Sequence, residues 1–140
     1  MARDLQTLIR LNEWTVDQKR SELGDVLRSL ATLEIGLERL RVEVIKEQEV
    51  VNGSPELAGF FYGNYANAVV DRRYHLNEGI TRMEAEVAEA REKLNEAYRD
   101  LKKYEVAQEN RDLIEAKELA REEQNTLDEL AIQGYRRKRG

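Results

Sequence analysis

Residues 9–51 of this chain read IRLNEWTVDQKRSELGDVLRSLATLEIGLERLRVEVIKEQEVV. Every seventh residue is aliphatic, and the series is Ile9, Val16, Leu23, Leu30, Leu37, Val44 and Val51. The companion positions three residues further along are more mixed: Leu5, Asn12, Lys19, Val26, Leu33, Leu40 and Glu47. A strict seven-residue repeat is typical of a left-handed coiled coil. A helix over 4–51 would be roughly 70 Å long and could not bury this stripe alone, so we expect a partner helix.

The repeat stops at a short turn, for which we expect residues 52–55. Asn52-Gly53 tolerates the left-handed conformation that often ends a helix. Ser54 is a suitable N-cap, and Pro55 suits the first position of a new helix. Because the turn is short, the helices that flank it should be antiparallel neighbours.

A second heptad series follows the turn, with Ile80, Val87, Leu94 and Leu101 at one position and Met83, Ala90, Ala97 and Tyr104 at the other. Its phase breaks after Tyr104, since Gln108 and Arg111 fall where apolar residues are due. We therefore predict an all-α fold. It is a single domain over 1–140, a long antiparallel two-helix coiled-coil hairpin with helices over 4–51 and 56–133. From about Glu105 onward, helix 2 should overhang helix 1 as a single charged helix with a thin apolar stripe.

The composition supports an elongated helical protein. Charged residues make up 36% of the 140 residues and aromatics 6%, which is too polar for a large compact core. The net charge of −5 does not favour nucleic acid as a partner. The absence of cysteine excludes disulfides and Cys-ligated metals. We found no apolar run that could span a bilayer and no signal-peptide pattern, so we expect a cytoplasmic location.

No residue pattern indicates catalysis, and we expect neither a catalytic site nor a cofactor or metal. His75 is the only histidine, and no Cys or second His can complete a metal shell with it. Gly59 and Gly63 are not followed by the Lys-Ser/Thr of a phosphate loop. The carboxylates are spread over helix surfaces, where none is isolated for acid chemistry.

Three groups outside the seam are candidates for partner contact. Trp14, with Leu11 beside it, should lie opposite the seam, where an exposed Trp is typical of a binding hot spot; coverage by the second helix or by self-association is the alternative. Aromatic residues just after the turn form either a docking patch or the closure of the hairpin tip: Phe60, Phe61, Tyr62 and Tyr65. The basic end, residues 135–139, either complements the helix dipole or meets an acidic partner.

Two stretches carry a resemblance to a known family. Residues 8–20 contain Leu-Ile-Arg-Leu and Val-Asp-Gln-Lys-Arg, and residues 123–137 contain Leu-Asp-Glu-Leu-Ala and end in Tyr-Arg-Arg. Together with the length and the two-helix layout, they make the chain similar to the FliJ family of flagellar type III export proteins.

The resemblance implies a non-enzymatic stalk. Proteins of that family insert an antiparallel coiled coil into the hexameric export ATPase, promote its assembly and activity, and contact the cytoplasmic part of the export gate and substrate chaperones. Location would then be cytoplasmic, peripheral to the inner-membrane export apparatus without insertion into the membrane. The residues implied in ATPase contact are Arg10, Leu11, Trp14, Leu127, Asp128, Glu129 and Arg136. Those implied at the gate or tip are Phe60, Phe61, Tyr65, Val69, Arg72 and Leu76.

Three other functions fit a helical hairpin. The first is the equivalent stalk of a virulence-type injectisome, and the second is a structural tether that self-associates through a long seam. The third, a tRNA-gripping arm, needs basic side chains that the Glu-rich surface lacks. The stalk interpretation predicts a monomeric hairpin in isolation, because its seam is satisfied within one chain.

Overall fold

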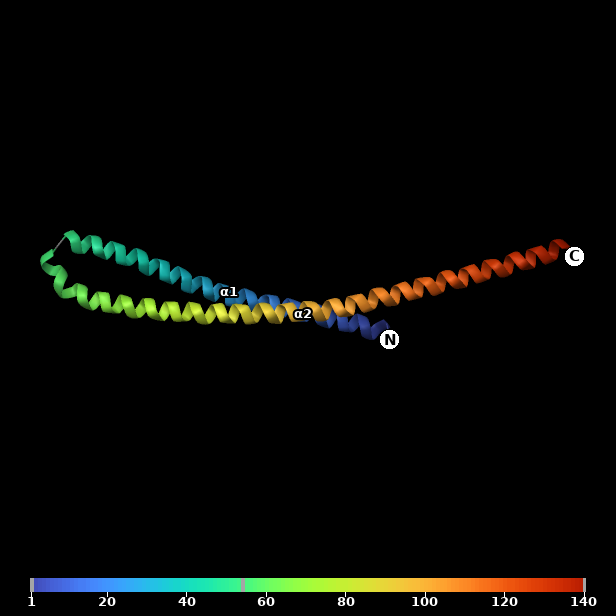
Figure 1. Cartoon of the computed structure of the whole chain (residues 1–140), viewed down its shortest axis with the longest axis horizontal. Helices are drawn as coiled ribbons and strands as arrows, with labels where there is room; N and C mark the ends of the chain where they lie inside the picture. The colour runs from blue at the N-terminus through green and yellow to red at the C-terminus, as the bar shows by residue number, and fades with distance from the viewer. Residues whose placement is uncertain (1, 54, 140) are drawn as a thin grey trace. The chain divides into compact units, whose positions relative to one another are not determined.

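The computed structural model describes residues 2–53 and 55–139, with side chains in 4–53 and 63–139. Every described residue is helical: α1 spans Ala2–Gly53 and α2 spans Pro55–Arg139 (Figure 1). The all-α prediction is confirmed, and the two long helices pack against each other as a hairpin requires. The contacts divide the chain into two units. The first joins the start of α1, up to Trp14, to α2 from Tyr98 onward, and the second comprises Thr15–Ala97.

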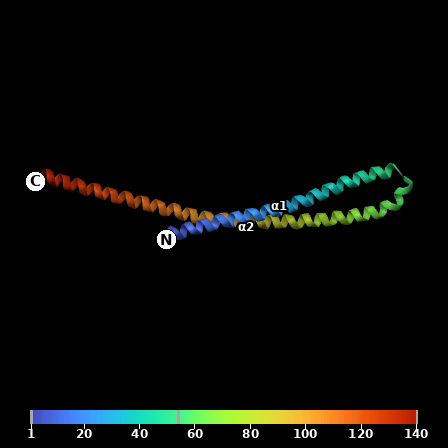
Figure 2. The ribbon, with the colours of Figure 1, turned by 180° about the vertical axis from the view of Figure 1, so that it is seen from behind.

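The second unit holds the best-packed part of the seam. Its fully buried apolar residues are Val16, Leu40, Val69, Val87 and Ala97, and Leu40 is the most enclosed at 1% exposure. All the seventh-position residues of α1 within this unit, from Val16 to Val51, are buried or half-buried. In both ribbon views, the cyan and green part of α1 runs alongside the green and yellow part of α2 (Figures 1 and 2). The heptad phase read from the sequence is therefore the phase of the packed seam.

Two glycines set how closely the helices approach in this unit. A Cβ on Gly36 would lie 3.3 Å from Leu76 Cδ2, and one on Gly79 would lie 3.1 Å from Leu33 Cδ1. Each glycine thus receives a leucine from the opposite helix. These two contacts and the ion pair between Glu43 and Arg72 define an antiparallel register. Close approach accounts for Gly36, while Gly24 faces only its own helix neighbour Arg28.

In the first unit the two helices pack through more polar residues. Leu5, Ile9 and Asn12 of α1 are half-buried, and so are the α2 positions Leu101, Tyr104, Glu105, Gln108 and Arg111. The expectation that α2 overhangs from about Glu105 was wrong by almost two turns, because the exposed segment begins at Asp112. Gln108 and Arg111 occupy seam positions because their long side chains cover apolar surface there. Gln108 Nε2 donates to Asp112 Oδ1 at 2.8 Å, whereas Gln108 Oε1 and Arg111 Nη1 are buried.

The helix ends differ from the expected ones. The left-handed cap at Asn52-Gly53 was wrong, since α1 stays helical through Gly53 and no described glycine has a positive φ. Pro55 is the first residue of α2, where its missing N–H is harmless, and Ser54 lies outside the described residues. At its other end α2 continues past residue 133 to Arg139. That the chain forms a single domain stays a prediction.

The glycine contacts predict opposite responses to alanine. Gly24→Ala should stabilise the fold by roughly 0.5–1 kcal/mol, because alanine favours the helix and meets only the mobile end of Arg28. Gly79→Ala should give no gain or a loss, since its Cβ displaces Leu33. Thermal unfolding followed by circular dichroism compares the two, and an equal gain from both variants would contradict the close approach at Gly79.

The burial pattern predicts where the stability of the second unit resides. Leu40→Ala should cost about 2–5 kcal/mol of unfolding free energy, because it leaves a cavity in the seam. The matched control is Ile35→Ala, whose side chain is 53% exposed, and it should change stability by no more than about 0.5 kcal/mol. Urea unfolding measures both variants; similar losses would mean that the seam phase is misassigned.

Candidate interaction surfaces

The described residues hold no grouping of three or more His, Cys, Asp and Glu side chains that could bind a metal ion. His75 lies exposed on α2, with its ring edge-on to Tyr74 at a centroid distance of 5.7 Å. Among the described residues, neither helix contains a segment long and apolar enough to cross a membrane.

The structure places the first candidate set on the exposed side of α1. Trp14 is 60% exposed and Leu11 is 56% exposed, with Arg10 exposed beside them. Ile9, one residue before this set, is half-buried in the seam. A large aromatic ring and a leucine left in water, next to a guanidinium group, have the composition of a protein-binding hot spot.

The second part of the same candidate set lies on α2 and is fully exposed: Leu127, Asp128, Glu129 and Arg136. The Asp128 carboxylate accepts a hydrogen bond from Gln124 Nε2 at 3.0 Å, one turn earlier on the same helix. The last half-buried position of α2 is Arg111, and Leu127 lies about 24 Å further along at the rise of an α-helix. The structure therefore does not bring the two parts together, and they form two contact areas in the first unit.

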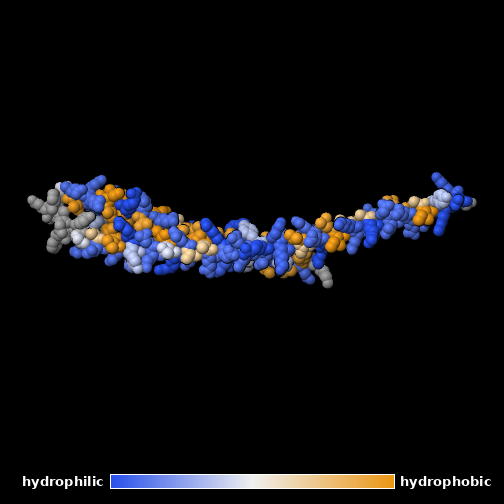
Figure 3. All heavy atoms as spheres, in the orientation of Figure 1, coloured by the Kyte–Doolittle hydropathy of each residue, from blue (hydrophilic) through white to orange (hydrophobic). Residues whose placement is uncertain are grey.

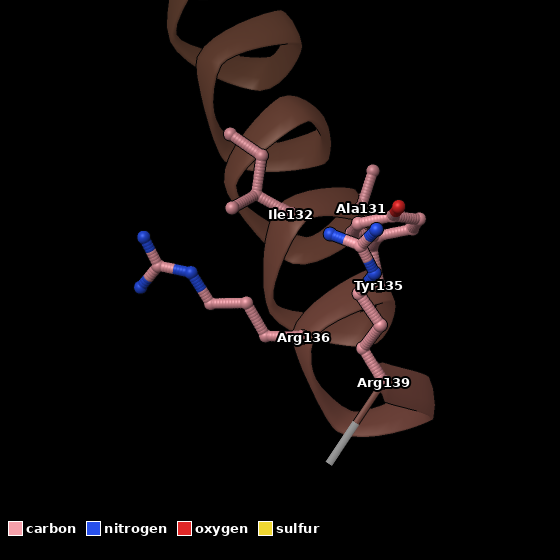
Figure 4. Close-up of a pocket in the computed structure, with 5 residues that line it drawn as sticks. All are labelled: Ala131, Ile132, Tyr135, Arg136 and Arg139. Carbon is pink, nitrogen blue, oxygen red and sulfur yellow. The ribbon is translucent and has the colours of Figure 1, made fainter.

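The end of α2 combines apolar and cationic groups. A shallow notch is lined by Ala131, Ile132, Tyr135, Arg136 and Arg139 (Figure 4). The Arg139 guanidinium lies over the Tyr135 ring, 5.4 Å from its centroid, whereas Arg136 points away from that ring. Four basic residues fill the last turn, where they complement the helix dipole.

The candidate gate set is divided by the seam. Val69 is buried and Leu76 is half-buried against Gly36, so both pack between the helices. Tyr65 is half-buried, and Arg72 is exposed, with its guanidinium 3.4 Å from the Glu43 carboxylate. The side chains of Phe60 and Phe61 lie outside the described residues.

Sequence reasoning missed an apolar stripe on the outer face of α1. Ile35, Val42 and Ile45 are each between 40% and 53% exposed and lie opposite the seam residues Leu37 and Leu40. Their spacing of seven and three residues is the signal that could have revealed this second face. On α2, Val70 and Tyr74 are also exposed apolar residues one turn apart.

Charges on these faces are held by short-range contacts within each helix. Arg41 donates to both oxygens of the Glu38 carboxylate, and this hydrogen bonding lowers the pKa of Glu38. On α2, Tyr74 donates to the Glu78 carboxylate at 2.7 Å, which raises the pKa of the Tyr74 hydroxyl. Both contacts are open to water, so they order the surface and add little stability.

Comparison with known proteins gives the chain its family. The family model described as "Flagellar FliJ protein" matches residues 1–140. Two curated relatives named "Flagellar FliJ protein", from Caulobacter vibrioides strains NA1000 / CB15N and ATCC 19089 / CIP 103742 / CB 15, are each 29% identical over 126 residues. The matches cover 90% of this chain and 90% of each relative. No solved structure matches the chain. Because the family model covers the whole sequence, this chain belongs to the flagellar FliJ protein family.

Proposed function

We propose that this chain is a non-enzymatic component of the flagellar type III export apparatus. In this role it is a coiled-coil stalk that enters the hexameric ring of the export ATPase and promotes its assembly and activity. The observation that carries the proposal is the exposed segment Asp112–Arg139, a single helix that extends beyond the positions paired with α1 in the first unit. Family membership supports the flagellar setting over an injectisome.

The exposed segment has the dimensions of a slender rod. The segment Asp112–Arg139 is roughly 40 Å long at the helical rise, and a single helix with its side chains is about 10–12 Å wide. Its exposed side chains include apolar groups such as Leu127 as well as charges of both signs. A continuous helix resists bending because each backbone hydrogen bond is made within it, and such a rod can bias a ring that changes shape during ATP hydrolysis.

The proposed ring contacts come from both parts of the first unit. Trp14, with Arg10 and Leu11, supplies an apolar anchor beside a positive charge. Further along α2 the proposed contacts are Leu127, Asp128, Glu129 and Arg136. Since Leu127 lies about 24 Å along α2 beyond Arg111, the last half-buried position of that helix, the two parts would touch different levels of the ring.

The second unit is the proposed contact for the cytoplasmic region of the export gate and for export chaperones. Arg72 is exposed and can exchange its Glu43 partner for a carboxylate of the gate. Tyr65, Phe60 and Phe61 complete the proposed tip surface. Contact through Val69 or Leu76 would require the two helices to part, because both side chains pack in the seam. In this role the protein works in the cytoplasm at the inner-membrane apparatus, without insertion into the bilayer.

The stalk role predicts a direct effect on the export ATPase. Purified ATPase from the same organism should hydrolyse ATP faster and form more hexamers when this chain is added at equal subunit concentration. Negative-stain electron microscopy counts the rings while phosphate release gives the rate. No change in either quantity at saturating concentration would exclude ring insertion.

The exposed tryptophan predicts a selective loss of binding. Trp14→Ala should leave the helical circular dichroism signal unchanged and raise the Kd for the ATPase by about tenfold or more, as expected for a hot-spot aromatic. Ile35→Ala is the matched control, since it removes a similarly exposed apolar side chain from the second unit and should leave this Kd unchanged. Unfolding of the Trp14 variant would show instead that Trp14 belongs to the core.

A further inference from the structure

The exposed segment Asp112–Arg139 carries an apolar stripe that no described residue covers. Leu113, Leu127 and Leu130 are each between 58% and 60% exposed. At the helical period they share one face with small residues that are also exposed, Ala116, Ala120, Ala131 and Gly134, and Glu123 interrupts this face between Ala120 and Leu127. In Figure 3, hydrophobic spheres interrupt the hydrophilic surface toward the C-terminal end. Small residues on an apolar face allow another helix to approach closely.

Charge is separated along the same segment. Residues 112–123 hold five carboxylates against the two basic residues Lys117 and Arg121, and these carboxylates are Asp112, Glu115, Glu118, Glu122 and Glu123. Asp128 and Glu129 follow, and the last turn holds only basic charges: Arg136, Arg137, Lys138 and Arg139. None of these residues forms an ion pair with another residue in the part of the chain that the structure describes. In the second unit, by contrast, neighbouring charges pair at three- and four-residue spacing.

We propose that in the free protein this segment pairs antiparallel with the same segment of a second copy of the chain. The apolar stripe supplies the contact area, and the charge separation selects the orientation. Antiparallel pairing brings the basic last turn of each copy to the acidic start of the other. Parallel pairing would place the two basic last turns together, with Arg137 beside Arg137, which like charges oppose.

The helical geometry gives this pairing a register. With Leu127 beside the two-fold axis, Arg137 of one copy lies near Asp112 and Glu115 of the other, on the same side of the stripe. Ala131 and Gly134 then meet Ala120 and Ala116, so the backbones can approach closely in the outer halves of the contact. Each copy contributes both halves of the charge contact, so the interface is self-complementary.

This pairing concerns the free chain and does not rest on ring insertion. The expectation of a monomer followed from the seam, whose apolar residues are satisfied within one chain. That expectation left out the apolar stripe of Asp112–Arg139, whose leucines lie outside the seam and are exposed to water. Self-pairing covers Leu127 and Arg137, so it competes with any other partner that binds this part of α2.

Reversing the charge of Arg137, alone and together with the charges of Asp112 and Glu115, tests the pairing. Sedimentation equilibrium at low salt should show two copies per particle for the unaltered chain and dissociation on dilution. Arg137→Glu should raise the dissociation constant by about tenfold or more, and adding Asp112→Arg with Glu115→Arg in the same chain should restore it. Arg39→Glu, an exposed charge reversal in the second unit, should have no effect. A single copy at every concentration, or a dimer insensitive to the Arg137 change, would overturn the proposal.

Cysteine cross-linking tests the orientation, and the cysteine-free sequence makes each introduced thiol unique. Ala116→Cys and Gly134→Cys variants, distinguished by a mass tag, should form the mixed disulfide in preference to either homodimer. Preferred homodimers at both positions would indicate parallel pairing and contradict the register. Ile35→Cys provides the control for random collision, because its site lies outside the proposed interface.

Discussion

The heptad seam between α1 and α2 is the constraint on which the rest of the molecule depends. Every fully buried side chain among the described residues belongs to it, and all of them lie in the second unit. Leu33 and Leu76 fit over glycines of the opposite helix, so the contact fixes register as well as distance. The seam buries one face of each helix. A partner must therefore bind an outer face of the paired helices or the end of α2, which has no partner helix.

The seam also divides the outer surface into regions of different character. In the second unit, local ion pairs such as Glu38 with Arg41 hold the surface charges, and exposed apolar residues such as Ile35 form a narrow stripe. In the first unit the seam becomes polar at Gln108 and Arg111, and α2 then continues alone. The apolar and charged side chains of this unpaired end of α2 make no contact with α1 and are exposed. They are therefore available both to the export ATPase and to a second copy of the chain.

Periodicity predicted the part of the fold that burial determines. The seven-residue series from Ile9 identified the seam, and the interruption at residues 52–55 identified the reversal of the chain. Periodicity failed where polar residues pack in the seam. Gln108 and Arg111 are polar, so the sequence pattern placed the end of the seam before them, although both are half-buried in it. It also did not show that Val69 would be enclosed while Arg72 would be exposed, because that depends on the register between helices. The heptad phase alone placed Trp14 outside the seam. The sequence of one chain does not identify the protein that Trp14 contacts.

Hydrogen exchange measured along the chain tests the central claim, that one seam holds the molecule together and leaves the end of α2 unsupported. In dilute solution the slowest amides should lie near Leu40 and Val87, where packing is tightest. Amides in Asp112–Arg139 should exchange at nearly the rate of an isolated helix. Equal protection along all of α2 in a single-copy particle would contradict the account, because it would require packing for Asp112–Arg139 that the seam does not provide.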